Sequence, residues 1–528
     1  MRIRSFLLNV AALVCAACAS GPKPDQTYVV LASETVHQDS EWNAVAEKLQ
    51  AKHSAKLFYF NRQPREALDQ VRNLSPRYVA IVEKPENIND KYVIDLAKMS
   101  REIDDDIYAD YLWGIITGYT AESASRMLDN STEPLTIHNC VSDIAELNSG
   151  KWFDNHAWVD DHVKGQAGEK KGFDSEVKVY QFNFDDELKV FSDFFKPYAP
   201  DLFVTATHAN FNNLTVPFMP ANQSKFVSHE GKVYKEYNLQ RGEEVSFAGN
   251  RNVYFAVGNC LIGGINNDPN SMPPAWINHA NSATMIGYVV TTWYGRNGWG
   301  GLKYWITNPG RYTLSQSIYL NQQDMMAQMN RWDPAFDTID FPFTLTEEQQ
   351  ARVNESRKQM EEFLKKHKRE ELRTLPPDQR PRVLSDNALA METIETLPSI
   401  DKADMDMVGF LYDRDVLAYY GDPLWDVRIQ ELKGETDFKV QQRCRKGICT
   451  LTITTDQDFS LERMQGGHFK EEHVLDLPFS YFLPARLKNA RLVEGQDWDA
   501  VVDENFVLVY NPGFEPGKTY TIKIAYDQ

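Results

Sequence analysis

A histidine and a cysteine each follow an apolar run in the middle of this chain. His208 stands near the end of DLFVTATHAN (residues 201–210), and Cys260 lies within NVYFAVGNCLIGG (residues 252–264). Both runs indicate buried strands, and ligands of α/β sheets bind at the carboxyl ends of such strands. Two neighbouring strands of this kind would bring an imidazole and a thiol to one site. That pairing suits a cysteine nucleophile assisted by a histidine acid or base.

The segments before this pair alternate between short apolar runs and amphipathic stretches. Such alternation is typical of βαβ units and of a mostly parallel sheet. The predicted elements in chain order are strand 28–34, helix 41–54, strand 56–61, strand 78–84, helix 88–103, strand 111–118 and helix 121–129. We therefore expect the reactive pair to lie on an α/β domain.

The pattern changes after the histidine. Residues 210–250 predict a β-hairpin insertion, and a helix from about 274 to 287 leads into a strand at 288–294. The charge-rich stretch 345–375 has pairing possibilities at i,i+4 spacing, which predicts an exposed helical excursion. Residues 408–429 then restore the sheet pattern.

The last part of the chain, residues 435–528, alternates with period two between turn signals, which favours a small antiparallel β-sandwich. Cys444 and Cys449 bracket RKGI in a predicted hairpin, so we expect a structural disulfide between them in an oxidising compartment. Cys140 has no partner left except Cys260, and that pairing would block the proposed nucleophile. We therefore expect Cys140 to be a buried free thiol.

The first residues resemble an export signal. Arg2 and Arg4 precede an apolar run at 6–14, which is too short to span a bilayer usefully. The alanines before Cys18 resemble the lipobox of bacterial lipoproteins, although Cys15 stands where that pattern prefers an aliphatic residue. We expect a lipoprotein-type signal peptide over 1–18, lipidation of Cys18 and a tether over 19–27. The alternative is simple secretion with cleavage near Ala19.

Composition limits the possible partners. The chain has 528 residues, of which 42% are hydrophobic, and a formal net charge of −19. This length predicts two to three domains, and no basic face is available to neutralise nucleic-acid phosphates. We expect an exported protein that is anchored by lipid in the bacterial cell envelope, at the outer membrane or in the periplasm, or is otherwise secreted. Its membrane contact would be through the lipid alone.

Several motifs together resemble the gingipain-like cysteine peptidases, a family with a caspase-like fold. The matching pieces, spread over about 28–429, are DDDIYADYLWGIITGYT, TATHAN, AVGNCLIGG, AWINHANSATMIGYVVTTWYG and YYGDPLWD. The resemblance implies an α/β catalytic domain over 28–430, a mostly parallel sheet with helices on both faces. It also implies that the trailing β-sandwich is similar to the immunoglobulin-like module that often follows such domains.

The resemblance also implies roles for particular residues. Cys260 matches the nucleophile, and His208 matches the general acid that protonates the leaving amine. The main-chain N–H groups of Cys260 and Ala209 would form the oxyanion hole. The chain departs from the family pattern at Ala209, where Gly is usual, and at Asn259, where a small residue is usual. Asn259 would either crowd the site or contact the substrate.

Other site residues are suggested by the loops. One of Asp154, Asp160 and Asp161, for which we favour Asp161, could pair with a basic substrate side chain, or all three could form a solvated acidic face. Trp293 begins WYGRNGWGGLKYW, an expected wall of a peptide-binding cleft, although packing aromatics in a turn would look similar.

No cofactor is expected, with Ca²⁺ as the one possible exception. The candidate calcium ligands are Asp104, Asp105, Asp106 and Asp110.

The sequence thus predicts a cysteine endopeptidase that acts on a protein or peptide substrate. The alternative is a catalytically inactive, surface-anchored binding protein that keeps the caspase-like fold. Ala209 and Asn259 favour this alternative, whereas His208 and Cys260 favour the enzyme.

Overall fold

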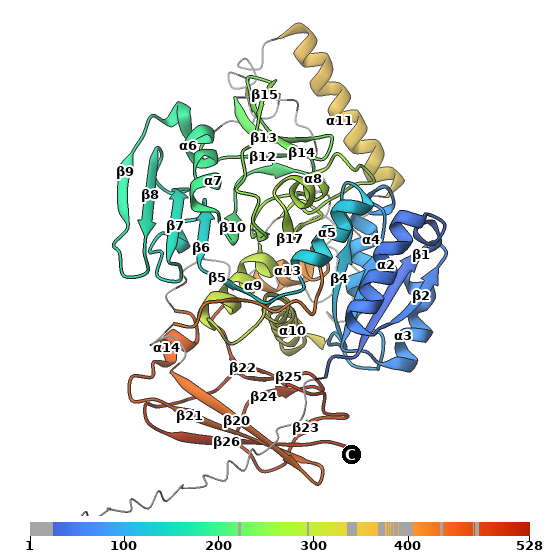
Figure 1. Cartoon of the computed structure of the whole chain (residues 1–528), viewed down its shortest axis with the longest axis vertical. Helices are drawn as coiled ribbons and strands as arrows, with labels where there is room; N and C mark the ends of the chain where they lie inside the picture. The colour runs from blue at the N-terminus through green and yellow to red at the C-terminus, as the bar shows by residue number, and fades with distance from the viewer. Residues whose placement is uncertain are drawn as a thin grey trace, which may run out of the picture.

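The computed structural model describes residues 25–527, except 220–222, 293–294, 335–345, most of 368–404, 433, 435–436, 468 and 470–474. The predicted signal peptide with Cys18 and the predicted cleft residue Trp293 lie outside the described residues. The described part of the chain has a mixed α/β body around one large sheet, with a C-terminal β-region (residues 438–527) packed below it in Figure 1.

The large sheet begins with a block of parallel strands, drawn in blue in Figure 1. In spatial order this N-terminal block is β2 (Lys56–Phe60), β1 (Tyr28–Ser33), β3 (Tyr78–Val82) and β4 (Leu112–Ile116). Every residue of β1 and β3 is buried, as expected for apolar runs that lie between neighbouring strands and helices. The helices of this block are α1 (Glu34–His37), α2 (Ser40–His53), α3 (Leu68–Leu74), α4 (Asp90–Met99) and α5 (Ala121–Asn130).

A second parallel block carries the residues of interest. In spatial order this site block is β17 (Ser282–Tyr288), β16 (Asn252–Ala256), β10 (Leu202–Thr205), β6 (Asn139–Ser142) and β7 (Asn155–Val159). Two antiparallel strands, β8 (Gln166–Lys171) and β9 (Lys178–Gln181), finish this edge of the sheet. Helices α6 (Glu187–Asp193) and α7 (Phe195–Tyr198) lie between β9 and β10 in the sequence.

One strand joins the two blocks. The strand β18 (Leu417–Gly421) pairs antiparallel to β17 over five residues and meets β4 at a single pair, Tyr420 with Ile115. The predicted mixed α/β fold with a mostly parallel central sheet is therefore confirmed, with β18 reversed against β17. The loops that follow β3 and β16 meet beyond the sheet, because the N–H of Asn267 donates to the carbonyl of Ile88 at 2.8 Å.

Two predicted elements differ in the structure. The predicted helix at 274–287 is a shorter helix, α8 (Met272–His279), followed at once by β17. The predicted sheet segment at 408–413 is part of helix α13 (Met405–Asp413). Both errors have one cause, since a short apolar run that is buried on all sides shows no period by which a strand can be told from a helix.

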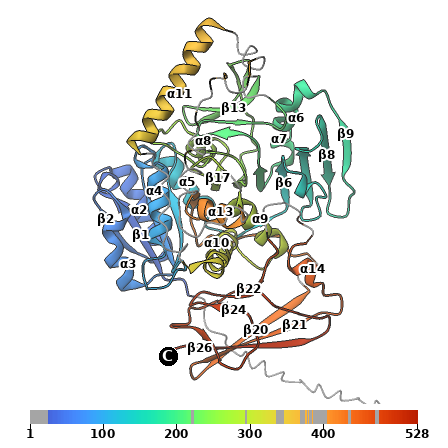
Figure 2. The ribbon, with the colours of Figure 1, turned by 180° about the vertical axis from the view of Figure 1, so that it is seen from behind.

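The remaining helices of the body follow the site block in the sequence. Helix α9 (Arg296–Thr307) is buried along its whole length, and α10 (Leu314–Trp332) packs against it. The predicted charged helix is α11 (Glu347–Lys366), which stands on the outside of the body in both views (Figures 1 and 2). Among the described helices, none combines the length and the apolar character needed to cross a bilayer.

The predicted hairpin insertion is a five-stranded antiparallel sheet that begins directly after His208. Its strands in order are β11 (Ala209–Asn210), β12 (Asn213–Thr215), β13 (Ser224–His229), β14 (Lys232–Tyr237) and β15 (Gln240–Glu244). A short two-stranded sheet pairs β5 (Leu135–Ile137) with β19 (Val427–Ile429).

The C-terminal β-region has two small antiparallel sheets and one helix, α14 (Leu461–Met464). One sheet contains β20 (Phe438–Arg445), β21 (Ile448–Thr455), β26 (Thr519–Ala525) and β23 (Arg491–Leu492); the other contains β22 (Phe479–Phe482), β25 (Phe506–Val509) and β24 (Ala500–Val502). Residues of both sheets share one apolar core, in which Leu451 and Ile522 of the first meet Phe479 and Val509 of the second.

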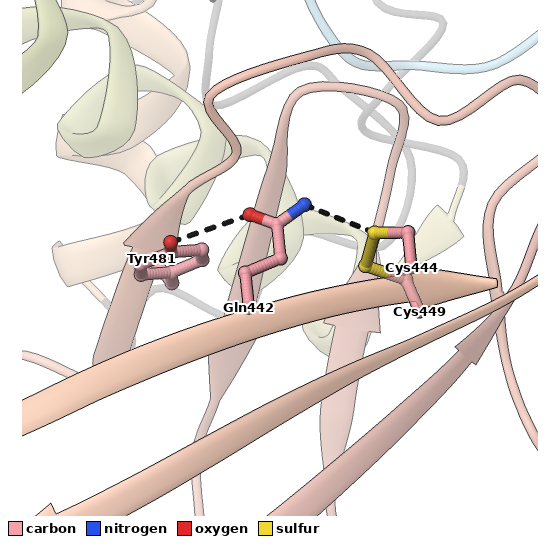
Figure 3. The surroundings of a disulfide bond; sticks show 4 residues. All are labelled: Gln442, Cys444, Cys449 and Tyr481. Carbon is pink, nitrogen blue, oxygen red and sulfur yellow. Dashed lines mark hydrogen bonds between the residues drawn. A yellow bond between two sulfur atoms is a disulfide. The ribbon is translucent and has the colours of Figure 1, made fainter. Parts of the chain in front are cut away.

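A disulfide lies in the first of these sheets. Cys444 and Cys449 are direct cross-strand partners of the hairpin β20–β21, and their sulfur atoms are 2.01 Å apart. Figure 3 shows the bond beside Gln442, whose amide contacts Cys444 and accepts a hydrogen bond from Tyr481. The sequence spacing of the two cysteines matches this arrangement, since the tight turn between the strands places them opposite each other.

A buried ion cluster fastens the N-terminal block to the middle of the sheet. The carboxylate of Asp422, just after β18, contacts His53 Nε2 at 2.6 Å and Lys52 Nζ at 2.9 Å, and accepts a hydrogen bond from the Tyr28 hydroxyl at 3.0 Å. Burial alone would raise the pKa of Asp422, but the hydrogen bond from His53 and the charge of Lys52 outweigh it and lower the pKa to about 2.

We predict that Asp422→Asn lowers the free energy of unfolding by about 3 kcal/mol at pH 7, because it leaves a buried cation without its partner. The unfolded-state pKa of an aspartate is about 3.9. The stability that comes from the lowered pKa is therefore present above pH 4 and is lost as the pH falls toward 2. Urea unfolding should show the difference between wild type and variant shrinking over that interval.

The matched control is Asp129→Asn, which removes the exposed partner of Lys48 on the same helix α2. An exposed pair contributes little, so we expect a change below about 0.5 kcal/mol. Equal losses in the two variants, or an Asp422→Asn loss that stays constant down to pH 2, would contradict the prediction.

Candidate active site

The structure brings His208 and Cys260 to the same edge of the sheet. Strands β10 and β16 are parallel neighbours, and their register pairs Thr205 with Ala256 at the end of the ladder. His208 and Cys260 follow these two residues closely, on loops that leave the same edge. Since neighbouring strands lie about 4.8 Å apart, the two loops run side by side.

Asn259 connects the two loops. Its side chain is 0% exposed. Its Oδ1 accepts a hydrogen bond from the Thr205 hydroxyl at 2.7 Å, and its Nδ2 donates to the carbonyl of Thr207 at 2.6 Å. The sequence suggested that Asn259 crowds the site or contacts substrate. In the structure its amide bonds to Thr205 at the end of β10 and to Thr207 in the histidine loop, so Asn259 joins the cysteine loop to these residues.

The histidine loop is also held on its other side. Asp143 follows β6, and its carboxylate accepts a hydrogen bond from the N–H of Ala206 at 2.9 Å. Burial raises the pKa of Asp143 well above its ordinary value. Thr215 of β12 donates to the carbonyl of His208 from both its N–H and its hydroxyl, each at 2.9 Å. The imidazole therefore rises from a loop that is fixed at three points. Nothing in the sequence pattern singled out Asp143 or Thr215.

Cys260 stands on a strained turn. Leu261, the next residue, has a φ of 60°, which is an unfavourable value for a branched side chain. The turn is held because the Leu261 N–H donates to the carbonyl of Val290 at 3.0 Å. The thiol is partly exposed, and it donates weakly to the carbonyl of Thr292 at 3.8 Å. The thiol thus makes its contact with a carbonyl and not with the imidazole.

Two main-chain N–H groups near the thiol are available to a ligand. Ala209 of β11 pairs with Leu214 of β12, and the bond from Thr215 to His208 makes this a pair without direct hydrogen bonds. The N–H of Ala209 therefore points away from β12, on the outer edge of its sheet. The N–H of Cys260 donates to no acceptor within the described part of the chain. These are the two N–H groups that the sequence analysis named as oxyanion donors.

The three candidate acidic residues occupy different places. Asp154 precedes β7, at the edge of the sheet opposite to Cys260, and bonds to Gln430. Asp160 is buried and accepts hydrogen bonds from the N–H groups of His162 and Val163, so it braces its own loop. Asp161 is partly exposed at the carboxyl end of β7, on the same edge as the site.

The carboxyl group of Asp161 lies in an unusual environment. One oxygen accepts a hydrogen bond from the N–H of Ala145 at 2.9 Å. Burial, and after it the charge of Glu146, raises the pKa of Asp161 to about 6. A cation placed beside this carboxyl group would stabilise its charged form.

The predicted calcium ligands are engaged locally. Asp104, Asp106 and Asp110 each accept a backbone N–H of their own loop. Burial raises the pKa of Asp110 to about 8, so this carboxyl group carries less charge than an ordinary aspartate. Among the described residues, no group of three or more acidic, histidine or cysteine side chains is placed to hold a metal ion.

The aromatic run expected to form a cleft wall is largely core. Trp293 lies outside the described residues. The residues from Arg296 onward form α9, in which Tyr304 and Trp305 are fully buried. The glycines of this run allow close packing of the helix, because a Cβ on Gly298 would lie 2.1 Å from the carbonyl oxygen of Val257.

No family model matches this chain, and no curated protein does. Among solved structures the chain is similar to the Arg-specific cysteine proteinase gingipain R (RGPB), at 8% identity and a TM-score of 0.41 over 96% of this chain and 93% of that chain. It is also similar to the RgpB pro- and mature-domain complex of Porphyromonas gingivalis, at 9% identity and a TM-score of 0.37 over 95% and 93%. A third structure, of a protease, aligns at 8% identity and a TM-score of 0.36 over 82% and 85%.

The first two of these structures belong to the family that the sequence motifs resemble. A fold hosts many activities, and function at such low identity must come from the residues of the site.

We predict that Cys260 is the more reactive of the two free thiols. Cys140 is 0% exposed, and burial, followed by the charge of Asp201, raises the pKa of its thiol well above its ordinary value. Because the thiolate is the reactive form, brief treatment of the native protein with iodoacetamide should alkylate Cys260 first. Peptide mass mapping measures both sites, and unfolded protein is the control in which they should react alike. Faster labelling of Cys140 in the native protein would contradict the assignment.

Proposed function

We propose that this protein is an exported cysteine endopeptidase in which Cys260 is the nucleophile and His208 the general acid. The observation that carries the proposal is the arrival of both side chains at one sheet edge, from the adjacent parallel strands β16 and β10. Two N–H groups there donate to no acceptor among the residues that the structure describes. The body corresponds in this proposal to a caspase-like catalytic domain, and the C-terminal β-region to an immunoglobulin-like β-sandwich.

The reaction begins when the Cys260 thiol loses its proton to water and the thiolate attacks the carbonyl carbon of a peptide bond. A carbon–sulfur bond forms, and the N–H groups of Cys260 and Ala209 donate to the oxygen that becomes negative. When the intermediate collapses, the carbon–nitrogen bond breaks and the protonated imidazole of His208 gives its proton to the leaving amine. Water then hydrolyses the thioester, and His208 takes the proton that water loses.

The contact between the Cys260 thiol and Thr292 bears on the separate roles of Cys260 and His208 in the reaction. In the resting structure the Cys260 thiol lies against the carbonyl of Thr292. We therefore assign His208 mainly to the leaving group and not to activation of the sulfur.

Asp161 is the residue that we propose for recognition of a basic substrate side chain. It lies on the site edge, two strands from β10 in the order β10–β6–β7. A bound cation would form a charge-assisted pair with this carboxyl group and lower its raised pKa. Asp154 and Asp160 are excluded from this role by the contacts described above.

We predict that His208→Ala lowers kcat/KM for a peptide amide by about 10²- to 10⁴-fold, because the amine leaves poorly without a proton. The same change should lower hydrolysis of an activated ester by less than about 10-fold, since that leaving group needs no proton. Cys260→Ala should abolish both reactions. The measurement is steady-state hydrolysis of the two substrates by the wild type and both variants.

Equal losses for ester and amide in His208→Ala would mean that the histidine activates the thiol. Undiminished turnover in Cys260→Ala would remove the peptidase proposal. A wild-type protein that hydrolyses neither substrate while Cys260 stays accessible to iodoacetamide would favour the inactive binding protein.

We predict that Asn259→Ala lowers kcat for the amide by about 10- to 100-fold, because it releases the histidine loop from the cysteine loop. KM should change little, since the side chain is buried away from the substrate. The matched control is Asn250→Ala. Asn250 bonds to the carbonyls of Ala199 and Pro200, near the opposite ends of the same two strands.

Both asparagine variants should melt at a lower temperature than the wild type, but the loss in kcat should follow Asn259 alone. If Asn250→Ala lowers kcat to the same extent, Asn259 acts through general stability and the positioning role is wrong.

A further inference from the structure

A cavity of about 430 Å³ lies between the α/β body and the C-terminal β-region, away from the catalytic edge. The body contributes residues that precede β3 and that connect α9 to α10, and the C-terminal β-region contributes β22 with the residues after it. Both views show β22 directly beneath α10 (Figures 1 and 2). A cavity of this size can hold a small organic molecule.

Arg77 is the most unusual residue that lines this cavity. It is 1% exposed, and its guanidinium lies over the Phe482 ring at 4.2 Å. One terminal nitrogen donates to the carbonyl of Leu483. Its Nε and its other terminal nitrogen are buried without a hydrogen-bond partner. Burial lowers the pKa of Arg77, which is the sign of a charge held without adequate compensation.

Arg311 repeats this arrangement on another wall. Its guanidinium lies over the Phe438 ring at 4.0 Å, and one terminal nitrogen donates to the Phe438 carbonyl at 3.0 Å. Its Nε is buried without a partner. Burial lowers the pKa of Arg311 as well. Two buried guanidinium groups with unpaired nitrogen atoms therefore border one cavity.

The carboxylates that line the cavity are already engaged. Asp25 pairs with Arg486 at 3.1 Å and accepts hydrogen bonds from Thr27. Asp426 pairs with Arg428, which also donates to the carbonyl of Arg311 at 2.7 Å. The charges of Arg77 and Arg311 thus remain in excess in a chain whose net charge is −19. The cavity lining is thus positively charged, whereas the chain as a whole is negatively charged.

We propose that this cavity binds a small organic oxyanion, a carboxylate or a phosphate, between Arg77 and Arg311. A buried guanidinium with unused N–H groups is unfavourable, and a planar or tetrahedral oxyanion accepts from such a fork through charge-assisted hydrogen bonds. The polar side chains of Gln316 and Tyr481 line the same space. The site is independent of the proposed peptidase activity.

The test uses the complete purified protein with inorganic phosphate and, separately, citrate as probes, against chloride at equal ionic strength. Titration calorimetry should show saturable binding of at least one probe, and saturation should raise the melting temperature by a few °C. Arg311→Gln should weaken binding at least about 10-fold. Arg77→Lys should also weaken it, because lysine keeps the charge but loses the fork.

The matched control is Arg331→Gln. Arg331 also joins the body to the C-terminal β-region, through Asp499, but it lies outside the cavity. Its removal should leave the affinity unchanged. If Arg77→Lys fails to fold, Arg311→Gln and Arg331→Gln decide the question by themselves.

Tighter binding of phosphate than of citrate would assign a phosphate ligand, and the reverse order a carboxylate. Absence of saturable heat with both probes, or equal affinity in Arg311→Gln and the wild type, would overturn the proposal. Neither result would bear on Cys260 or His208.

Discussion

The parallel pairing of β10 with β16 is the constraint on which the candidate site depends. A thiol and an imidazole separated by about 50 residues of chain can meet only if their strands are neighbours, run in the same direction and end at the same level. The ladder between Thr205 and Ala256 satisfies all three conditions. Asn259 then continues the connection past the last ladder bond, where main-chain pairing can no longer hold the loops.

This arrangement bears on Ala209 and Asn259, the two positions at which the sequence departs from the pattern that it resembles. A residue larger than glycine at position 209 is tolerated because Ala209 sits in a regular antiparallel pair, which needs no unusual backbone conformation. A residue larger than usual at position 259 is tolerated because its side chain turns inward and its amide is fully used. The Asn259 side chain is buried and bonded to Thr205 and Thr207, and it does not contact the Cys260 thiol.

Many of the strands and helices could be predicted from the sequence, and those that could not were missed for physical reasons. Strands such as Tyr28–Ser33 and helices such as Ser40–His53 were predictable because their patterns of apolar and polar residues fit one type of secondary structure better than the other. The boundary between α8 and β17 and the helix α13 were not, because burial on all sides removes the period. The roles of Asn259, Asp143 and Thr215 depend on long-range pairing, which no local pattern encodes.

The N-terminal block supports the candidate site without supplying His208 or Cys260. The loop after its β3 meets the loop that follows Cys260, because the N–H of Asn267 donates to the carbonyl of Ile88 at 2.8 Å. On the other side of Cys260, β18 pairs with β17, and β17 supports the cysteine loop, since Gly263 donates to the carbonyl of Tyr288 at 2.9 Å. The turn at Leu261 has an unfavourable φ, and such strain persists where the surrounding structure fixes the backbone, as these bonds do here.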